Sequence, residues 1–326
     1  MKTAPQSLAG LARLILSEGC QSITLLTGAG VSVAADIPDF RSPGGMYDTL
    51  RPELLTATPR QQSLMRMDPT YVVAWDIFQD NAFPYLEVRR PFILGVREQK
   101  WKATIAHRFV ELLHTKTNKI QRLYTQNIDG LHQQCQQIPD EKIIPVHGTL
   151  SKVQCEGCAS NDMDFDSFCD LVQTQIKDIY GQDPKAPATS TPIKCTKCHK
   201  PLVKPQTVLF GRSLPPAFFQ NCRTDLAQTD LLIVAGTSLV VSPANSLVQM
   251  TGGIRVVINR DLVGEDLGMF QDSRDYFAAG NCDDVFLDLI VELGWLSDLY
   301  AQLDGLAPKS AALVRKRMEQ EQGDSS

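Results

Sequence analysis

No apolar run in this 326-residue sequence approaches the roughly 20 consecutive residues that a membrane-spanning helix needs. A charge excess of one sign is also missing, because 32 basic residues stand against 37 acidic ones and the net charge is −5. Such a charge gives no general attraction to nucleic acid or anionic lipid. We therefore expect a globular protein that has no membrane partner and no direct nucleic-acid partner.

The N-terminus lacks an apolar segment of the signal-peptide type before strand-like sequence begins at Ser22. The nine cysteines are an odd number, which leaves at least one unpaired in any disulfide scheme. Cysteine pairs in a reducing compartment favour metal over disulfide. We expect a cytoplasmic protein, with the nucleus as a second compartment.

Three known site signatures are incomplete or absent. The turn at 27–32 has Gly28 and Gly30, but Val33 stands where the common dinucleotide fingerprint has its third glycine. No Gly-Lys-Ser/Thr follows, so the turn is not a P-loop. No Gly-x-Ser-x-Gly nucleophile elbow is present. Taken alone, this turn fits a phosphate site and an ordinary strand–helix connection equally well.

Apolar segments alternate with helix-type patterns along most of the chain, which predicts a parallel α/β sheet. The expected strands are 23–27, 120–125, 143–146, 231–235 and 254–258, and the expected helices are 7–17, 69–78, 104–114, 285–293 and 311–320. Four strands end in polar or glycine residues: Gly28-Ala29-Gly30, Gln126-Asn127, Gly236-Thr237-Ser238 and Asn259-Arg260. Ligands of open parallel sheets bind outside the carboxyl ends of the strands, so we expect one crevice there.

Several residues near these ends have a chemical and a structural interpretation. Asn127 and Asp129 suit hydrogen bonds to a ribose or amide, or the capping of a helix. His147, next to Gly148, suits a general base, although a single histidine is more often structural. The triplet 39–41 could place an aromatic ring and a cation over a ligand, or form an exposed loop.

Two CxxC pairs are the most specific signal. Cys155 and Cys158 form the first pair, Cys195 and Cys198 form the second, and 36 residues separate the two. Two such pairs complete a tetrahedral zinc site, and four cysteines leave no open position for catalysis. We therefore predict one structural Zn²⁺ in a small module that carries an insertion.

These motifs, taken in order, resemble the sirtuins, which are NAD-dependent protein-lysine deacylases, and especially their deacetylase branch. The resemblance rests on GAGVSVAADIPDFRSP, YTQNIDGLH, VHGTL, the paired CxxC, VLFGRSLP, GTSL and VINR, and it covers about residues 8–299. The implied fold is a Rossmann-like parallel sheet with helices on both faces, a small zinc-binding module and a helical insertion. The predicted parts are a discontinuous NAD-binding domain (1–35, 115–150 and 205–300), a cofactor loop with the helical part of the small domain (36–114), the zinc module with its insertion (151–204) and a C-terminal tail (301–326).

The resemblance also implies roles for individual residues. The catalytic residues would be His147, as the base, and Asn127. The NAD-binding residues would be Gly28, Ala29, Gly30, Asp39, Phe40, Arg41, Tyr47, Gln126, Asn127, Asp129, Gly236, Thr237, Ser238, Asn259, Arg260 and Cys282. The substrate peptide would pair with Val208, Phe210, Gly211 and Arg212.

The implied reaction converts acetyl-lysine, NAD and water into lysine, nicotinamide and 2′-O-acetyl-ADP-ribose through an imidate, which places the enzyme among transferases. The expected partners are proteins with acetylated lysine, with histone-like or tubulin-like substrates as candidates. Two alternatives stay open: protein mono-ADP-ribosyl transfer, which uses the same electrophile, and a non-catalytic NAD- and zinc-binding adaptor.

The chain departs from the family pattern at three positions. Asp36 stands in place of a glycine, Leu209 in place of a phenylalanine and Arg212 in place of a glutamate. Arg212 predicts a preference for acidic residues around the acetyl-lysine. Sirtuins that remove acidic acyl groups use a tyrosine and an arginine near residues 72–81, and this stretch has no arginine. We therefore expect a preference for neutral acyl chains.

Overall fold

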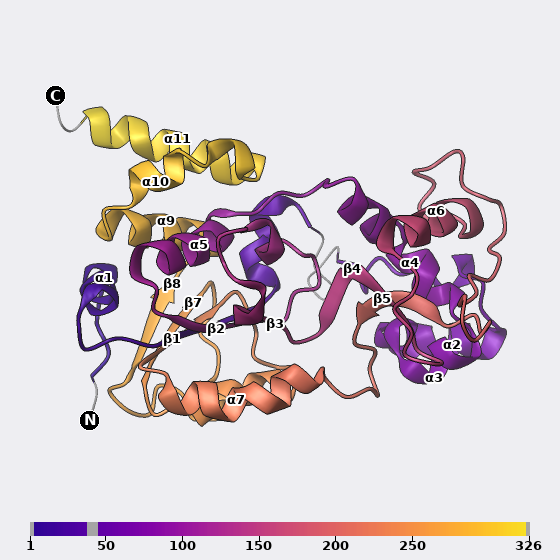
Figure 1. Cartoon of the computed structure of the whole chain (residues 1–326), viewed down its shortest axis with the longest axis horizontal. Helices are drawn as coiled ribbons and strands as arrows, with labels where there is room; N and C mark the ends of the chain where they lie inside the picture. The colour runs from indigo at the N-terminus through magenta and orange to yellow at the C-terminus, as the bar shows by residue number, and fades with distance from the viewer. Residues whose placement is uncertain (1–2, 38–44, 324–326) are drawn as a thin grey trace.

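A six-stranded sheet lies at the centre of the larger part of the molecule in the computed structural model, which describes residues 3–37 and 45–323 (Figure 1). All neighbouring strands are parallel, in the order β3-β2-β1-β6-β7-β8. Their bounds are β1 Ile23–Thr27, β2 Ile120–Thr125, β3 Ile143–Pro145, β6 Leu231–Ala235, β7 Ile254–Asn259 and β8 Asp275–Ala279. The chain reverses its direction of travel across the sheet between β1 and β6, and such a switch point opens a crevice at the strand ends.

Helices cover both faces of this sheet (Figure 1). One face carries α1 Leu8–Leu16, α5 Ile105–Thr117, α9 Cys282–Glu292, α10 Leu296–Tyr300 and α11 Pro308–Gly323, and the other carries α7 Pro216–Gln228 and α8 Leu247–Met250. Side chains of a strand alternate between the faces. Leu231 and Ile233 of β6 therefore join the core under α5 and α9, while Leu232 and Val234 join the core under α7. The fully buried central strands β1 and β6 and the two helical layers confirm the predicted Rossmann-like fold.

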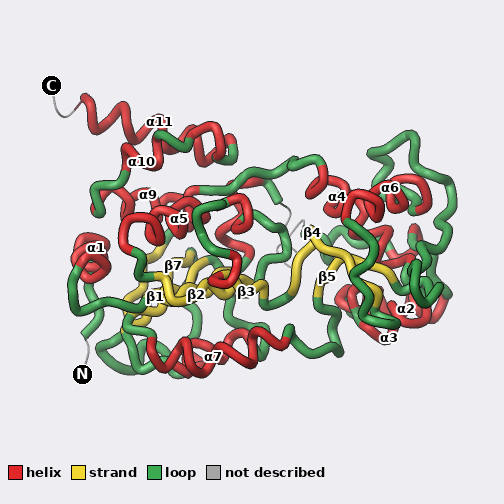
Figure 2. Tube along the Cα trace, viewed as in Figure 1, coloured by secondary structure: helices red, strands yellow, loops and turns green. Residues whose placement is uncertain are grey.

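A smaller part lies beside the carboxyl ends of the strands and has a hydrophobic core of its own (Figure 2). It contains α2 Pro59–Met67, α3 Trp75–Asp80, α4 Phe83–Arg97, α6 Phe165–Gln175 and the antiparallel pair β4 Gly148–Cys155 and β5 Val203–Thr207. Short 3₁₀ turns complete the fold: η1 Ala29–Ala35, η2 Pro52–Leu54, η3 Pro69–Val73, η4 His132–Gln134, η5 Asp140–Lys142, η6 Ala244–Ser246, η7 Glu265–Leu267 and η8 Leu303–Gly305.

The insertion of the zinc module packs on α4 through buried charged groups. The Arg90 guanidinium donates to the carbonyl of Ile176 at 2.9 Å and pairs with Asp183 at 2.6 Å. The Glu87 carboxylate, which is fully buried, accepts from the Ser190 hydroxyl at 2.6 Å. Since removing one partner of a buried charged pair is strongly destabilising, these contacts hold α4 in one orientation.

The structure differs from the sequence prediction in several elements. The helix expected over 69–78 is interrupted at Ala74, whose extended backbone separates η3 from α3. The sequence analysis did not predict the helices α2, α4, α7, α8 and α10 or the strands β4, β5 and β8. The helix expected over 311–320 is present but longer, and Ser310, Ala311 and Val314 are buried. Within the described residues, no helix has both the length and the apolar character needed to cross a membrane.

Candidate active site

A cavity of about 860 Å³ lies between the strand ends and the smaller part. Residues from all four predicted strand ends line this cavity, together with the residues predicted to bind the substrate peptide. Of the predicted site residues, the lining contains Gly28, Ala29, Gly30, Tyr47, Gln126, Asn127, His147, Val208, Phe210, Gly211, Arg212, Gly236, Thr237, Ser238, Asn259, Arg260 and Cys282. The prediction of one crevice is therefore confirmed. Asp39, Phe40 and Arg41 lie outside the described residues.

Glycines allow two turns to touch at the base of the cavity. A Cβ on Gly30 would lie 2.5 Å from the Gly236 Cα, and Gly236 itself has a φ of 62°. Side chains at these positions would push the two strand ends apart. The N–H groups of Gly28 and Gly30 donate to the carbonyls of Ala235 and Gly236. The first role of these glycines is thus to join β1 and β6 closely.

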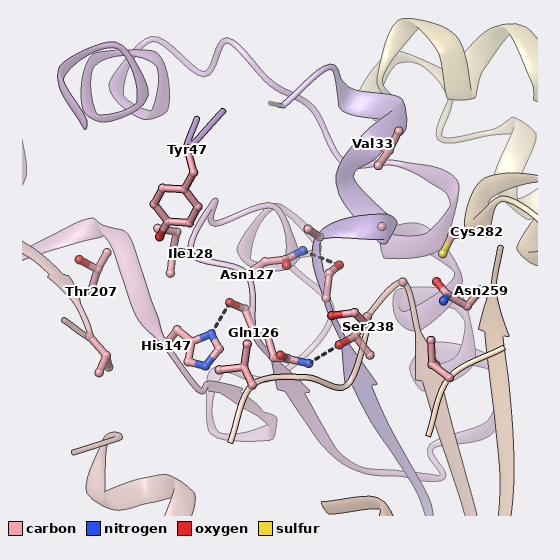
Figure 3. A pocket seen from close by; sticks show the side chains of 18 of the residues that line it. Val33, Tyr47, Gln126, Asn127, Ile128, His147, Thr207, Ser238, Asn259 and Cys282 are labelled. Atoms are coloured by element: carbon pink, nitrogen blue, oxygen red, sulfur yellow. Dashed lines mark hydrogen bonds between the residues drawn. The ribbon is translucent and has the colours of Figure 1, made fainter. Parts of the chain in front are cut away.

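Polar side chains after β2 are fixed by hydrogen bonds to both neighbouring turns (Figure 3). Gln126 Nε2 donates to Thr237 Oγ1 at 2.9 Å. Asn127 Nδ2 donates to the Gly28 carbonyl at 3.1 Å and to Ser32 Oγ at 3.0 Å. These bonds set the side-chain positions of Gln126 and Asn127 before any ligand binds.

Asp129 lies behind the lining, although we expected it to face the ribose pocket. Its carboxylate accepts from Ser32 Oγ at 2.7 Å and from the Leu131 N–H at 2.9 Å. Burial raises the pKa of the Asp129 carboxyl, and these two hydrogen bonds oppose the rise. Because Ser32 also contacts Asn127, Asp129 supports the site through Ser32.

His147 lines the cavity next to Gln126 and lies between β3 and β4 in the chain. Its Nδ1 is 3.0 Å from the Gln126 carbonyl oxygen (Figure 3). A carbonyl can only accept, so Nδ1 carries the proton and Nε2 is the basic nitrogen. Gly148 follows with a φ of 78°, and a Cβ there would lie 1.7 Å from the Gln206 carbonyl oxygen. Only glycine fits beside His147, and this arrangement suits a general base.

The predicted substrate segment is held by main-chain bonds on both sides. The Val208 N–H donates to the His147 carbonyl at 2.8 Å, and the Phe210 N–H donates to the Val73 carbonyl at 3.0 Å. The Arg212 guanidinium lies 4.6 Å from the centre of the Trp75 ring, and its Nη2 is 3.1 Å from Glu156 Oε2. The segment is therefore ordered at the mouth of the cavity. Leu209, one of the departures from the family pattern, is buried in its lining.

Two lining residues that the sequence analysis missed are Tyr85 and Arg89 of α4. They are four residues apart and so share one face of the helix. Arg89 is only 5% exposed, and Tyr85 Oη is 2.6 Å from Thr207 Oγ1. The expectation of neutral acyl chains considered 72–81 alone and is therefore incomplete. Recognising the helix 83–97 from its sequence would have revealed this pair.

The far end of the cavity is lined by Asn259, Arg260 and residues at the start of α9. Cys282 is 6% exposed, and burial raises the pKa of its thiol to about 12. It is therefore a neutral thiol at physiological pH and suits an apolar contact better than a nucleophilic role.

The four cysteines of the two CxxC pairs come together at the ends of β4 and of the insertion. Their sulfur atoms all lie within 4.8 Å of one another, with 3.6 Å between Cys155 and Cys198 and 3.7 Å between Cys158 and Cys195. A tetrahedral site with zinc–sulfur bonds of about 2.3 Å has sulfur–sulfur edges of about 3.8 Å. The N–H groups of Gly157 and Lys197 point at Cys155 and Cys195. The cluster thus fits one Zn²⁺ with no open position.

The cavity also fits a dinucleotide. Its volume is at the upper end of ordinary ligand pockets, and it joins glycine turns, fixed amides and the cation Arg260. This geometry, a doubly wound sheet with a ligand cavity at its switch point and a Cys₄ module in the smaller part, defines a class of dinucleotide-binding proteins.

Comparison with known proteins supports the same class. The model of the Sir2 family matches residues 28–243, and the chain belongs to this family, the sirtuins. It is 33% identical to "NAD-dependent protein deacetylase sirtuin-2" of Danio rerio over 90% of this chain and 73% of that protein. It is 31% identical to "NAD-dependent protein deacetylase hst2" of Schizosaccharomyces pombe over 90% of this chain and 78% of that protein. It is 33% identical to "NAD-dependent deacetylase sir2C" of Dictyostelium discoideum, and the match spans 60% of that protein's length.

Proposed function

We propose that this sirtuin is an NAD-dependent protein-lysine deacetylase. The main support is that His147, with Nε2 as its basic nitrogen, lines the same cavity as the strand-end residues and the substrate segment. The names of the relatives support the same reaction. The proposed substrates are proteins with acetylated lysine, with histone-like or tubulin-like proteins as candidates, and the proposed compartments are the cytoplasm and the nucleus.

Bound NAD would supply the electrophilic ribose carbon. The residues of the chain would do the rest. Asn127 and Gln126 would orient the ribose and nicotinamide amide, since their side chains are already fixed by hydrogen bonds. His147 would take a proton from a ribose hydroxyl at Nε2 while Nδ1 stays bonded to the Gln126 carbonyl. Ile128, which is 7% exposed, and Phe210 would exclude water from the lysine stem.

The structure changes our expectation about which acyl groups the enzyme removes. Neutral chains were expected, yet Arg89 places a guanidinium in the lining next to Tyr85. A buried arginine is a good partner for a carboxylate. The substrate test should therefore include carboxylate-bearing acyl-lysines beside acetyl-lysine.

The test uses NAD labelled in the adenosine part, incubated with an acetylated protein. A deacetylase moves the label into acetyl-ADP-ribose, whereas a mono-ADP-ribosyltransferase leaves it on the protein. An adaptor without catalysis leaves NAD unchanged. The first outcome is expected, and either of the others would contradict the proposed function.

A further inference from the structure

The C-terminal helix α11 contributes to the wall of the cavity. Lys309 and Leu313 are four residues apart, so they lie on one face of α11, and both line the cavity together with Val33 and Ala34 of η1. In Figure 3 the pale yellow C-terminal ribbon runs past Val33. The segment that we expected to be a tail thus reaches the cofactor side of the site.

The start of α11 is anchored by buried hydrogen bonds. Ser310 is fully buried, and its hydroxyl donates to Asp283 Oδ2 at 2.5 Å. The Asp283 carboxylate also accepts from the Ala106 N–H at the start of α5. The Ala307 N–H donates to the Ala103 carbonyl at 2.8 Å. These bonds fix the backbone on both sides of Lys309 at the start of α11.

Lys309 is bonded to Asp36, with 2.5 Å between Nζ and Oδ1. Asp36, the residue that caps η1, has a φ of 58° and a ψ of 28°. Glycine adopts this left-handed conformation most easily, and aspartate is one of the few other residues that tolerate it. The family pattern has a glycine here. In this chain an aspartate takes the same backbone conformation, and its carboxylate meets Lys309.

We propose that Lys309 is a positioning residue of the cofactor site, which acts by fixing the C-terminal end of η1 through Asp36. The other end of η1 begins at Ala29, directly after Gly28, so the pair sets the orientation of a segment that lines the cavity at both ends. This inference rests on the proposed NAD-dependent function. It predicts a selective effect on NAD, with the peptide site unchanged.

The test compares Lys309→Ala, Asp36→Asn and the double variant in the full-length chain loaded with zinc. Both side chains are 64% exposed, and exposed pairs have modest strength, so each single variant should raise the KM for NAD about two- to fivefold. The KM for the acetylated peptide and kcat should stay the same. Lys309→Arg should restore the KM. Lys316→Ala, an exposed lysine on the same helix, is the matched control and should behave like the wild type.

Asp36→Gly separates positioning from stability. Glycine adopts the left-handed conformation freely, so Tm should stay the same or rise while the KM for NAD still increases. Unchanged NAD KM values in Lys309→Ala and Asp36→Asn would overturn the inference. The inference would also be overturned if the NAD KM, the peptide KM and Tm all changed together. It would be overturned as well if the increase of the NAD KM in the double variant equalled the product of the two single-variant increases, because two residues that act as a pair are not independent. NAD binding is also measured by calorimetry, which does not depend on the proposed catalysis. The proposed deacetylase function would fail only if the wild-type protein did not convert NAD and acetylated peptide to products.

Discussion

The two halves of the cavity are built in different ways. The strand-end half consists of glycine turns and short polar side chains that are bonded to one another, such as Gln126 to Thr237 and Asn127 to Gly28. The small-domain half consists of large side chains, with Tyr85 and Arg89 on α4 and Phe210 and Arg212 beside them. Main-chain geometry thus shapes the strand-end half, which is the proposed NAD site, whereas side chains shape the small-domain half, which is the proposed substrate site.

The carboxylates of the described lining all lie in one half. Asp261, Asp283 and Asp284 lie in the strand-end half together with the cations Arg260 and Lys309, whereas the small-domain half contains the cations Arg89 and Arg212. Among the lining residues that the structure describes, the small-domain half has no carboxylate. We expect substitutions in the strand-end half to affect catalysis with any substrate, and substitutions in the small-domain half to affect the choice of substrate.

His147→Ala tests the first half and has the largest expected effect. Loss of a general base lowers rates by about 100- to 10,000-fold, so kcat should fall by about 1,000-fold. NAD binding by calorimetry and Tm should remain near the wild-type values, because His147 lies in the cavity lining, where water can replace its hydrogen bond to the Gln126 carbonyl. His114→Ala, on α5 and outside the lining, is the control. Full activity of His147→Ala would remove the histidine from the mechanism.

Cys198→Ser tests the zinc module, which belongs to the smaller part of the molecule and so to the small-domain half of the comparison. Loss of one of four zinc ligands should lower the free energy of unfolding by about 3 kcal/mol, measured by urea denaturation with metal content determined by mass spectrometry. Cys169→Ala changes a buried cysteine of the same module outside the cluster and should retain one zinc per chain. Unchanged stability and unchanged zinc content in Cys198→Ser would contradict a structural role of the metal at this cluster.

Arg89→Leu tests the acyl end of the second half. Removing a buried guanidinium should lower kcat/KM for succinyl-lysine about tenfold relative to acetyl-lysine, because the carboxylate loses its cationic partner. Arg97→Leu is the control. Arg97 lies on the same helix but pairs with Asp170 of α6, so its replacement should not change the ratio of kcat/KM for succinyl-lysine to kcat/KM for acetyl-lysine. An unchanged ratio in Arg89→Leu would mean that the acyl group does not reach Arg89.

Arg212→Glu, which introduces the usual family residue, should have the smallest effect. The KM of peptides with acidic flanks should rise about threefold and that of peptides with basic flanks should fall, as is usual for partly exposed charges. Arg212 is 45% exposed and already paired with Glu156, which limits the change. Arg223→Glu, on the exposed face of α7, controls for net charge. A uniform effect on both peptide sets would contradict a role in sequence preference.

The sequence predicted the strand-end half well because its signals are local. An apolar strand followed by glycine or short polar residues is visible within ten positions, and the two CxxC pairs are visible by spacing alone. The helix α4 was missed because its inner face mixes Tyr85 and Arg89 with apolar residues, and because Pro91 lies inside the helix. Lys309 and Asp36 lie 273 positions apart, and no local pattern can join such residues. The predicted roles of individual residues stay predictions until the variants are measured.

The central claim is that NAD is consumed as a reactant in step with deacylation. Its most direct test is to measure nicotinamide and deacetylated peptide in the same reaction, with purified zinc-loaded protein, NAD and an acetyl-lysine peptide. The account predicts equal amounts of both products and negligible nicotinamide without peptide. Peptide deacetylation without nicotinamide release, or nicotinamide release that ignores the peptide, would contradict it.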